Sequence, residues 1–282
     1  MTVLLAAALL LGGCAALADD ETPDDSVVAA AFYPLEYAAE RIADGHVPVE
    51  SLTSPGVEPH DLDLGVGETA TLARASVVVY EEGFQPAVDA AVETNATGTL
   101  VDAAEVVDLD TDDLHFWLDP LLMADLGDGI AAALAEADPE HADDFTANAA
   151  DLRSDLEALD GEYSSGLDTC ARDTVVVSHD AFGYLSRYGP DFEPIAGLSP
   201  DAEPTTADLA RLNDLIRAEG ITTVFSETLV SPEMAEILAG DLDIDSGVLD
   251  PIEGLGDTTA DEDYLSLMRA NLAALQKANG CR

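Results

Sequence analysis

The amino-acid sequence predicts an α/β protein of two βα lobes, each with a parallel sheet, joined by one long rigid helix. Short apolar runs alternate with segments of helical periodicity in two separate parts of the chain. Such alternation is typical of parallel sheets covered by helices. Between these two parts lies a long stretch with helical periodicity alone.

The first lobe is expected at residues 26–137. Its most apolar run has Val-Val-Val at the centre of residues 76–80, as a buried strand requires. The same reading places strands at 26–32, 47–53, 76–80 and 99–101, and helices at 34–43, 68–73, 85–93 and 120–137.

Residues 138–168 are predicted to form the helix that links the lobes. Asp138 is a favourable N-cap, and Pro139 suits the first helical position. One face carries four apolar side chains, at positions 145, 152, 156 and 159. At about 1.5 Å per residue the helix would reach roughly 40 Å, which is long for one small domain and suits a strut between two.

The second lobe is expected at residues 169–282, where the βα alternation resumes. Strands are predicted at 174–178, 192–196, 222–226 and 244–250, and helices at 181–188, 206–219, 232–240 and 263–279. Cys170 and Cys281 could form a disulfide outside the cell; two free buried thiols are the alternative.

The N-terminus is typical of a secreted lipoprotein. Residues 1–14 are interpreted as a signal peptide ending in the lipobox Leu11-Gly12-Gly13-Cys14, with Cys14 lipidated. The apolar run is too short to span a membrane, and no positive charge precedes it, which indicates an upstream start or an atypical signal. A buried N-terminal helix is the alternative. Residues 15–25 form an acidic tether, so we expect attachment to the extracellular face of the cytoplasmic membrane.

The net charge is −48, with 58 acidic residues against 10 Lys and Arg. At 48% hydrophobic residues the chain is too apolar for a disordered one. In about 1 M salt the Debye length falls to roughly 3 Å and the self-repulsion is screened. The composition therefore predicts a halophile source, and it excludes nonspecific nucleic-acid binding.

Three of the five histidines lie where ligands are expected. His60 and His179 follow predicted strands, and His115 precedes a helix, whereas His46 and His141 are interpreted as surface residues. Open α/β sheets bind ligands at the carboxyl ends of their strands. Asp250 occupies a similar position, and three imidazoles with one carboxylate suit tetrahedral zinc. Spacing alone does not establish the site, because these residues are scattered along the chain.

Several motifs, in order along almost the whole mature chain, resemble the metal-binding proteins of ABC importers for zinc and manganese, and most of all their ZnuA-like zinc type. They are Tyr33-Pro34-Leu35-Glu36-Tyr37, Pro59-His60-Asp61, His115-Phe116-Trp117-Leu118-Asp119-Pro120, Ser178-His179-Asp180-Ala181-Phe182, Gly197-Leu198-Ser199-Pro200, the run 224–232 and Val248-Leu249-Asp250-Pro251. The resemblance implies two lobes with the metal in the cleft between them. It also implies His60, His115, His179 and Asp250 as ligands.

The third ligand position indicates the metal. Manganese members usually carry Glu where this chain has His179, and three nitrogen ligands favour zinc. The acidic segment 108–113 stands where many zinc members have a long His-rich loop. Candidate residues for orienting the histidines are Glu58, Asp61, Asp180 and Glu227. Of these, Glu227 also follows a strand and is the substitute ligand if Asp250 is not one.

The resemblance implies an extracytoplasmic solute-binding protein that captures zinc and delivers it to a membrane permease with its ATPase. We expect a monomer without enzymatic activity. One alternative is a manganese receptor of the same family. A zinc-dependent hydrolase is another, but the chain has no HExxH or GxSxG motif, and a fourth protein ligand would close the site. A third is a surface protein, adhesive or structural, whose zinc only stabilises the fold.

Overall fold

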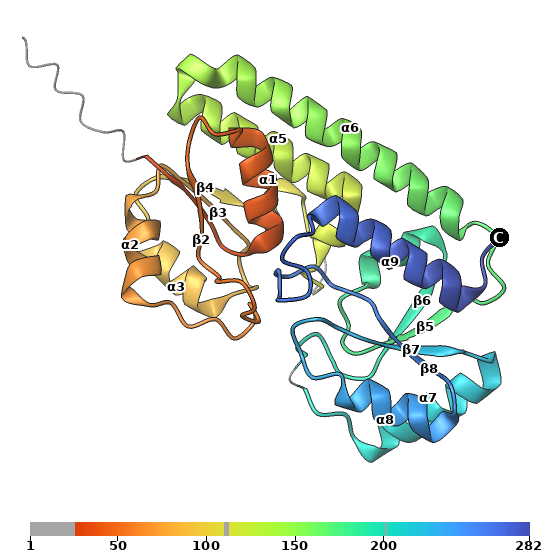
Figure 1. Cartoon of the computed structure of the whole chain (residues 1–282). Coiled ribbons are helices and arrows are strands. Elements are labelled where there is room, and N and C mark those ends of the chain that lie inside the picture. The colour runs from red at the N-terminus through yellow and green to blue at the C-terminus, as the bar shows by residue number, and fades with distance from the viewer. Residues whose placement is uncertain (1–25, 110–112, 201) are drawn as a thin grey trace, which may run out of the picture.

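The computed structural model describes residues 26–109, 113–200 and 202–282, and contains two parallel four-stranded sheets (Figure 1). The first has the order β2-β1-β3-β4 and the second β6-β5-β7-β8. The predicted class, two parallel α/β lobes, is confirmed. The predicted signal peptide, lipobox and tether lie outside the described residues.

The first sheet is built on two short apolar strands at its centre. Val28 of β1 aligns with Val49 of β2 on one side and with Val77 of β3 on the other. Strands β1, β2 and β3 are shorter than predicted because the ends of these apolar runs enter loops, whereas β4 extends one residue beyond its prediction. The elements are β1 Val28–Ala30, α1 Tyr33–Ala43, β2 Val49–Ser51, α2 Val66–Arg74, β3 Val77–Tyr80, α3 Pro86–Asn95, β4 Thr99–Asp102 and α4 Ala103–Val106.

A pair of long helices follows a short 3-10 turn, η1 (Phe116–Leu118). Helix α5 (Pro120–Ala137) begins at Pro120, and the Asp119 carboxylate accepts the Leu121 N–H as its cap. Helix α6 (Ala142–Leu167) begins three residues after Pro139, the first helical position that was predicted, because Pro139–His141 form a 3-10 turn, η2. Its 26 residues span about 39 Å.

Helix α6 runs along both lobes, as Figure 1 shows. It packs against α5 and α1 of the first lobe and against α9 (Tyr264–Asn279) of the second. The predicted apolar face is buried: Phe145, Leu152, Leu156 and Leu159 are all 0% exposed. The helical linker therefore packs against helices of both lobes and connects them through one continuous apolar face.

The second sheet belongs to the lobe at residues 169–282. The segment 183–188, expected to be α-helical, is the 3-10 helix η3 (Gly183–Tyr188). A capping box of Thr205 and Asp208 starts α7, and Asp263 caps α9. The remaining elements are β5 Thr174–Val177, β6 Asp191–Pro194, α7 Thr206–Glu219, β7 Thr223–Ser226, α8 Glu233–Leu242 and β8 Asp245–Val248.

The two lobes share one hydrophobic core, and a smaller core lies beneath α7 and α8. Buried hydrogen bonds also cross between the lobes. The indole N–H of Trp117 donates to the Pro251 carbonyl at 2.7 Å, and the Tyr264 hydroxyl donates to the Trp117 carbonyl at 2.5 Å. Because these groups are buried, wide opening of the lobes would leave polar groups unpaired.

A disulfide joins Cys170, just after α6, to Cys281, just after α9. The backbone N–H of Ala171 also donates to the Asn279 carbonyl, so the C-terminal tail is tied to the start of the second lobe. Within the described part of the chain, every helix is too short or too polar to span a bilayer.

Candidate metal centre

Four side chains from both lobes converge between the two sheets. His60 lies in the loop after β2, and His115 directly precedes η1. His179 follows β5, and Glu253 follows β8. Each offers a ligand atom within 4.8 Å of the other three, and the described residues contain no second such group. Three of the four side chains thus lie in loops that follow parallel strands, where this fold class binds ligands, and His115 lies before a 3-10 turn.

Four of the six distances between the ligand atoms are known from the structure. The Nε2 atoms of His60, His115 and His179 lie 3.4, 3.3 and 3.4 Å from Glu253 Oε1. The Nε2 atoms of His115 and His179 are 3.3 Å apart. Zinc–ligand bonds of about 2.0–2.1 Å place the corners of a tetrahedron about 3.3–3.4 Å apart. Four of the six edges therefore match those of a zinc tetrahedron.

Glu253 is buried among the imidazoles, with 2% of its side chain exposed. Burial alone would raise the pKa of Glu253, but the three neighbouring histidines hold it well below its usual value. Neither Glu253 Oε1 nor His60 Nε2 has a hydrogen bond of normal geometry within the described residues. A cation bound by both would satisfy these buried atoms.

Two of the three histidines, His115 and His179, have raised pKa values. Burial alone would lower the pKa of His179, but contacts with Glu227 and Glu253 raise it to about 10. Burial alone would also lower the pKa of His115, but contacts with Asp113 and Glu253 raise it. Since a metal binds only the deprotonated imidazole, metal and protons compete for these nitrogens.

Carboxylates hold two of the imidazoles by their other nitrogen. Glu227 Oε1 lies 2.6 Å from His179 Nδ1 and also accepts the backbone N–H of His179 and the hydroxyl of Ser178. Asp113 Oδ1 lies 2.8 Å from His115 Nδ1. Both contacts turn Nε2 toward the centre. Glu227 thus lies in the position expected of an orienting residue, whereas Asp113 was not singled out from the sequence.

The structure does not place Asp250 in the four-residue group. Its Oδ1 accepts the Ile252 N–H at 2.8 Å, and its Oδ2 accepts the Thr228 hydroxyl at 3.0 Å. Burial is the main cause that raises the pKa of Asp250 to about 6. Glu253, three residues further along the same loop, is the carboxylate of the four-residue group that could hold a metal ion. The sequence offered one signal for it: a second carboxylate in the loop after the last strand.

The other candidate residues have different surroundings. Glu58 Oε1 accepts the backbone N–H of His60 at 3.1 Å, and burial raises the pKa of Glu58. Asp61 is exposed, and the backbone N–H of Asp180 donates to the Gly197 carbonyl. Glu58 thus braces the His60 loop through the backbone, without touching the ring.

His46 and His141 lie away from the centre, at the junction of α1 and α6. Their ring centroids are 4.1 Å apart, and both side chains are partly exposed. They are the surface residues that the sequence predicted.

One pocket of about 200 Å³ opens onto the centre. It is lined by His60, His115 and the apolar side chains of Phe84, Leu114 and Leu198, with Gly83 and Ser199. His60 is the most accessible of the four, with 15% of its side chain exposed. Ion exchange is therefore expected on the His60 side.

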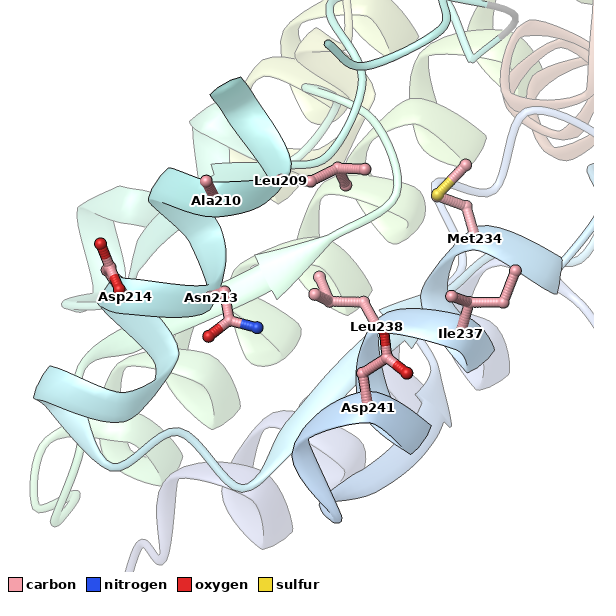
Figure 2. Close-up of a pocket in the computed structure, with 8 residues that line it drawn as sticks. All are labelled: Leu209, Ala210, Asn213, Asp214, Met234, Ile237, Leu238 and Asp241. Atoms are coloured by element: carbon pink, nitrogen blue, oxygen red, sulfur yellow. The ribbon is translucent and has the colours of Figure 1, made fainter. Parts of the chain in front are cut away.

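A larger groove, of about 390 Å³, lies between α7 and α8 (Figure 2). Leu209 and Leu238 face each other across it, and Asp214 and Asp241 lie along its sides. It contains no histidine or cysteine, so it lacks the ligands of the candidate centre.

Known proteins resemble the chain over most of its length. Residues 28–278 match the family described as zinc-uptake complex component A, periplasmic. The zinc-binding lipoprotein AdcA of Streptococcus pneumoniae is 32% identical over 87% of this chain and 54% of its own length. The chain thus spans about half the length of this curated relative.

Two further similarities also cover most of the chain. The high-affinity zinc uptake system protein ZnuA of Bacillus subtilis is 28% identical over 87% of this chain and 85% of its own length. The crystal structure of Zn(II)-bound AdcA from S. pneumoniae has a TM-score of 0.77 at 30% identity, over 90% of this chain and 57% of that one. With a family model covering nearly all of the described residues, the chain belongs to the family of zinc-uptake complex component A, periplasmic.

Proposed function

We propose that this protein is the extracytoplasmic solute-binding component of an ABC importer, which captures Zn²⁺ and delivers it to a membrane permease and its ATPase. The spacing of His60, His115, His179 and Glu253 carries the proposal, because it matches a zinc tetrahedron. The names of the zinc-uptake relatives support it.

The fourth ligand is Glu253 in this proposal, in place of the Asp250 that the sequence suggested. Glu253 Oε1 is within 3.4 Å of all three Nε2 atoms. Both oxygens of Asp250 are engaged by Thr228 and Ile252 instead. Among the described residues, Asp250 is not part of the group whose ligand atoms all lie within 4.8 Å of one another.

Zinc is the ion that this donor set favours. Three imidazole nitrogens and one carboxylate oxygen suit Zn²⁺, whereas Mn²⁺ prefers more oxygen ligands in an octahedral arrangement. A catalytic zinc keeps an open position for water, but four protein ligands close this one. The donor set therefore favours a binding receptor over a hydrolase, in agreement with a family of solute-binding receptors.

Capture exchanges protons for the metal. In the metal-free protein the raised pKa values of His115 and His179 and the lowered pKa of Glu253 favour charge pairing between them. Zinc displaces the protons and links ligands from both lobes. Because Trp117 and Tyr264 tie the lobes together through buried hydrogen bonds, only a small tilt accompanies capture and release.

The proposal also covers the oligomeric state, the membrane attachment and the salt conditions of the protein. We propose a monomer anchored by a lipid on Cys14 to the extracellular face of the membrane, with residues 26–137 and 169–282 as lobes and 138–168 as the linking helix. The net charge of −48 supports work at high salt.

Metal content and competitive titration in high salt test the proposal. We expect one tightly bound Zn²⁺ per chain, held more strongly than Mn²⁺, and an affinity at least a hundredfold lower in His179→Ala. His141→Ala, which removes a histidine outside the centre, is the matched control and keeps the wild-type affinity. Absence of stoichiometric metal, or an unchanged His179→Ala protein, would refute the proposal.

A further inference from the structure

The loop that carries Glu253 is anchored by several buried hydrogen bonds. Asn271 of α9 pairs with the backbone of Asp250: its Oδ1 accepts the Asp250 N–H at 2.9 Å, and its Nδ2 donates to the Asp250 carbonyl at 2.6 Å. The next carbonyl, of Pro251, accepts the Trp117 indole N–H. The backbone of Asp250 is thereby bonded to α9, and the backbone of Pro251 is bonded to the first lobe.

The Asp250 carboxylate extends this anchoring toward Glu253. Its Oδ1 accepts the N–H of Ile252, two residues along the chain, and its Oδ2 accepts the hydroxyl of Thr228 from the loop after β7. Asp250 is only 5% exposed, so these bonds form away from water. The carboxylate thus joins the turn at Ile252 to the second sheet.

Ile252 has a backbone conformation that its side chain disfavours. Its φ is +60°, and the other non-glycine residues with positive φ in the described ranges are all aspartates. A β-branched residue is strained in this left-handed region and persists there only where its surroundings hold it. Ile252 is completely buried, and it directly precedes Glu253.

We infer that Asp250 is a positioning residue, which holds Glu253 against the three imidazoles by keeping Ile252 in the left-handed conformation. This inference rests on the proposed function for its role in zinc binding. If Ile252 relaxed to negative φ, the chain direction after it would change and Glu253 would leave its place beside the Nε2 atoms. The Asp250 bond to the Ile252 N–H opposes that relaxation.

The test compares zinc affinity in Asp250→Ala with the double variant Asp250→Ala/Ile252→Gly. Removal of an indirect partner of a metal site typically weakens binding about 10–100-fold, and we expect this range for Asp250→Ala. Glycine adopts positive φ without strain, so the double variant should regain at least about tenfold of the lost affinity. If Asp250 were itself a ligand, or only stabilised the fold, removal of the buried Ile252 side chain would restore nothing.

Three further variants complete the comparison. Asp257→Ala, at an exposed position of the same loop, should bind zinc as the wild type does. Asp250→Ala/Ile252→Val keeps the β-branch and should not recover. Asp250→Asn keeps an acceptor for the Ile252 N–H, so it should bind more tightly than Asp250→Ala, even if the glycine variant fails to fold. A double glycine variant that folds but binds no better than Asp250→Ala would overturn the inference.

A metal-free readout separates this inference from the proposed function. In Asp250→Ala, hydrogen exchange at the Ile252 amide should be at least about tenfold faster than in the wild type, because its acceptor is gone. Suppose that the wild type binds no zinc, but exchange at the Ile252 amide is still faster in Asp250→Ala. The proposed function then fails, and the role of Asp250 in holding the loop is supported. If zinc binds and neither affinity nor exchange changes in Asp250→Ala, the inference fails alone.

Discussion

Glu227 Oε1 lies 2.6 Å from Nδ1 of His179 and accepts the backbone N–H of the same residue. One carboxylate oxygen therefore contacts both the ring and the main chain of a histidine of the candidate centre. The imidazole can then offer only Nε2 to the centre. Hydrogen bonds of this kind raise the basicity of a ligand and set its orientation.

Substitution Glu227→Gln should weaken zinc binding about 10–100-fold without abolishing it. The amide keeps the size of the side chain but loses the charge that supports His179. Competitive titration measures the loss. Glu219→Gln, at an exposed position at the end of α7, serves as the control. Equal affinities in the two variants would show that Glu227 does not support the ligand.

Zinc affinity should rise with pH. Burial alone would lower the pKa of His179, but Glu227 and Glu253 raise it to about 10, so the metal-free site is protonated at neutral pH. Each proton displaced makes binding more favourable as pH increases, until the histidine has titrated. Calorimetry in buffers of different ionisation enthalpy would count the protons released. A release of none at pH 7 would contradict the charged state of the centre.

The metal-free protein should lose stability as pH rises from 7 to about 10. A histidine with a raised folded-state pKa stabilises the fold fully below its ordinary value of 6.5 and stops doing so as pH passes the raised value. Denaturant unfolding across this range measures the effect. The zinc-loaded protein should show a smaller change, because its imidazoles are already deprotonated.

Tyr264→Phe should destabilise the fold by about 1–3 kcal/mol. The variant removes the buried hydroxyl that donates to the Trp117 carbonyl and leaves that carbonyl without this partner. Denaturant unfolding measures the change, and Tyr80→Phe, at the half-buried end of β3, is the control. Wild-type stability in Tyr264→Phe would show that this bond contributes little to holding the lobes together.

Replacement of both Cys170 and Cys281 by serine should lower the free energy of unfolding by about 2–4 kcal/mol. The bridge closes a segment with a sequence separation of 111 residues, so its loss allows a much less restricted unfolded chain. Zinc affinity should stay the same, because neither cysteine belongs to the centre. Unfolding of the oxidised and reduced protein provides the comparison.

Much of the fold was predictable because its signals are local. The strand at 77–80 is a run of apolar residues, and α7 carries its own capping box. The segment 183–188 was less predictable, since α and 3-10 helices share similar periodicity over so few residues. The start of α6 shifted for a similar local reason, the 3-10 turn at Pro139.

Within the centre, the histidines were easier to single out than the carboxylate. Only five histidines occur in the chain, and three lie in loops next to predicted strands or helices. The fourth position had to be chosen among 58 acidic residues, where Asp250 and Glu253 share one loop. Which of the two faces the imidazoles depends on the positive φ of Ile252, and no pattern in the sequence reveals that conformation.

X-ray absorption at the zinc edge tests the central claim most directly. Measured on the zinc-loaded protein in high salt, the spectrum should show four nitrogen or oxygen ligands at about 2.0–2.1 Å, three of them with the scattering of imidazole rings. The same measurement on Glu253→Ala should show a changed oxygen shell, with the three imidazoles still present. A wild-type spectrum with fewer than three imidazoles, or with six ligands, would contradict the proposed tetrahedral centre of His60, His115, His179 and Glu253.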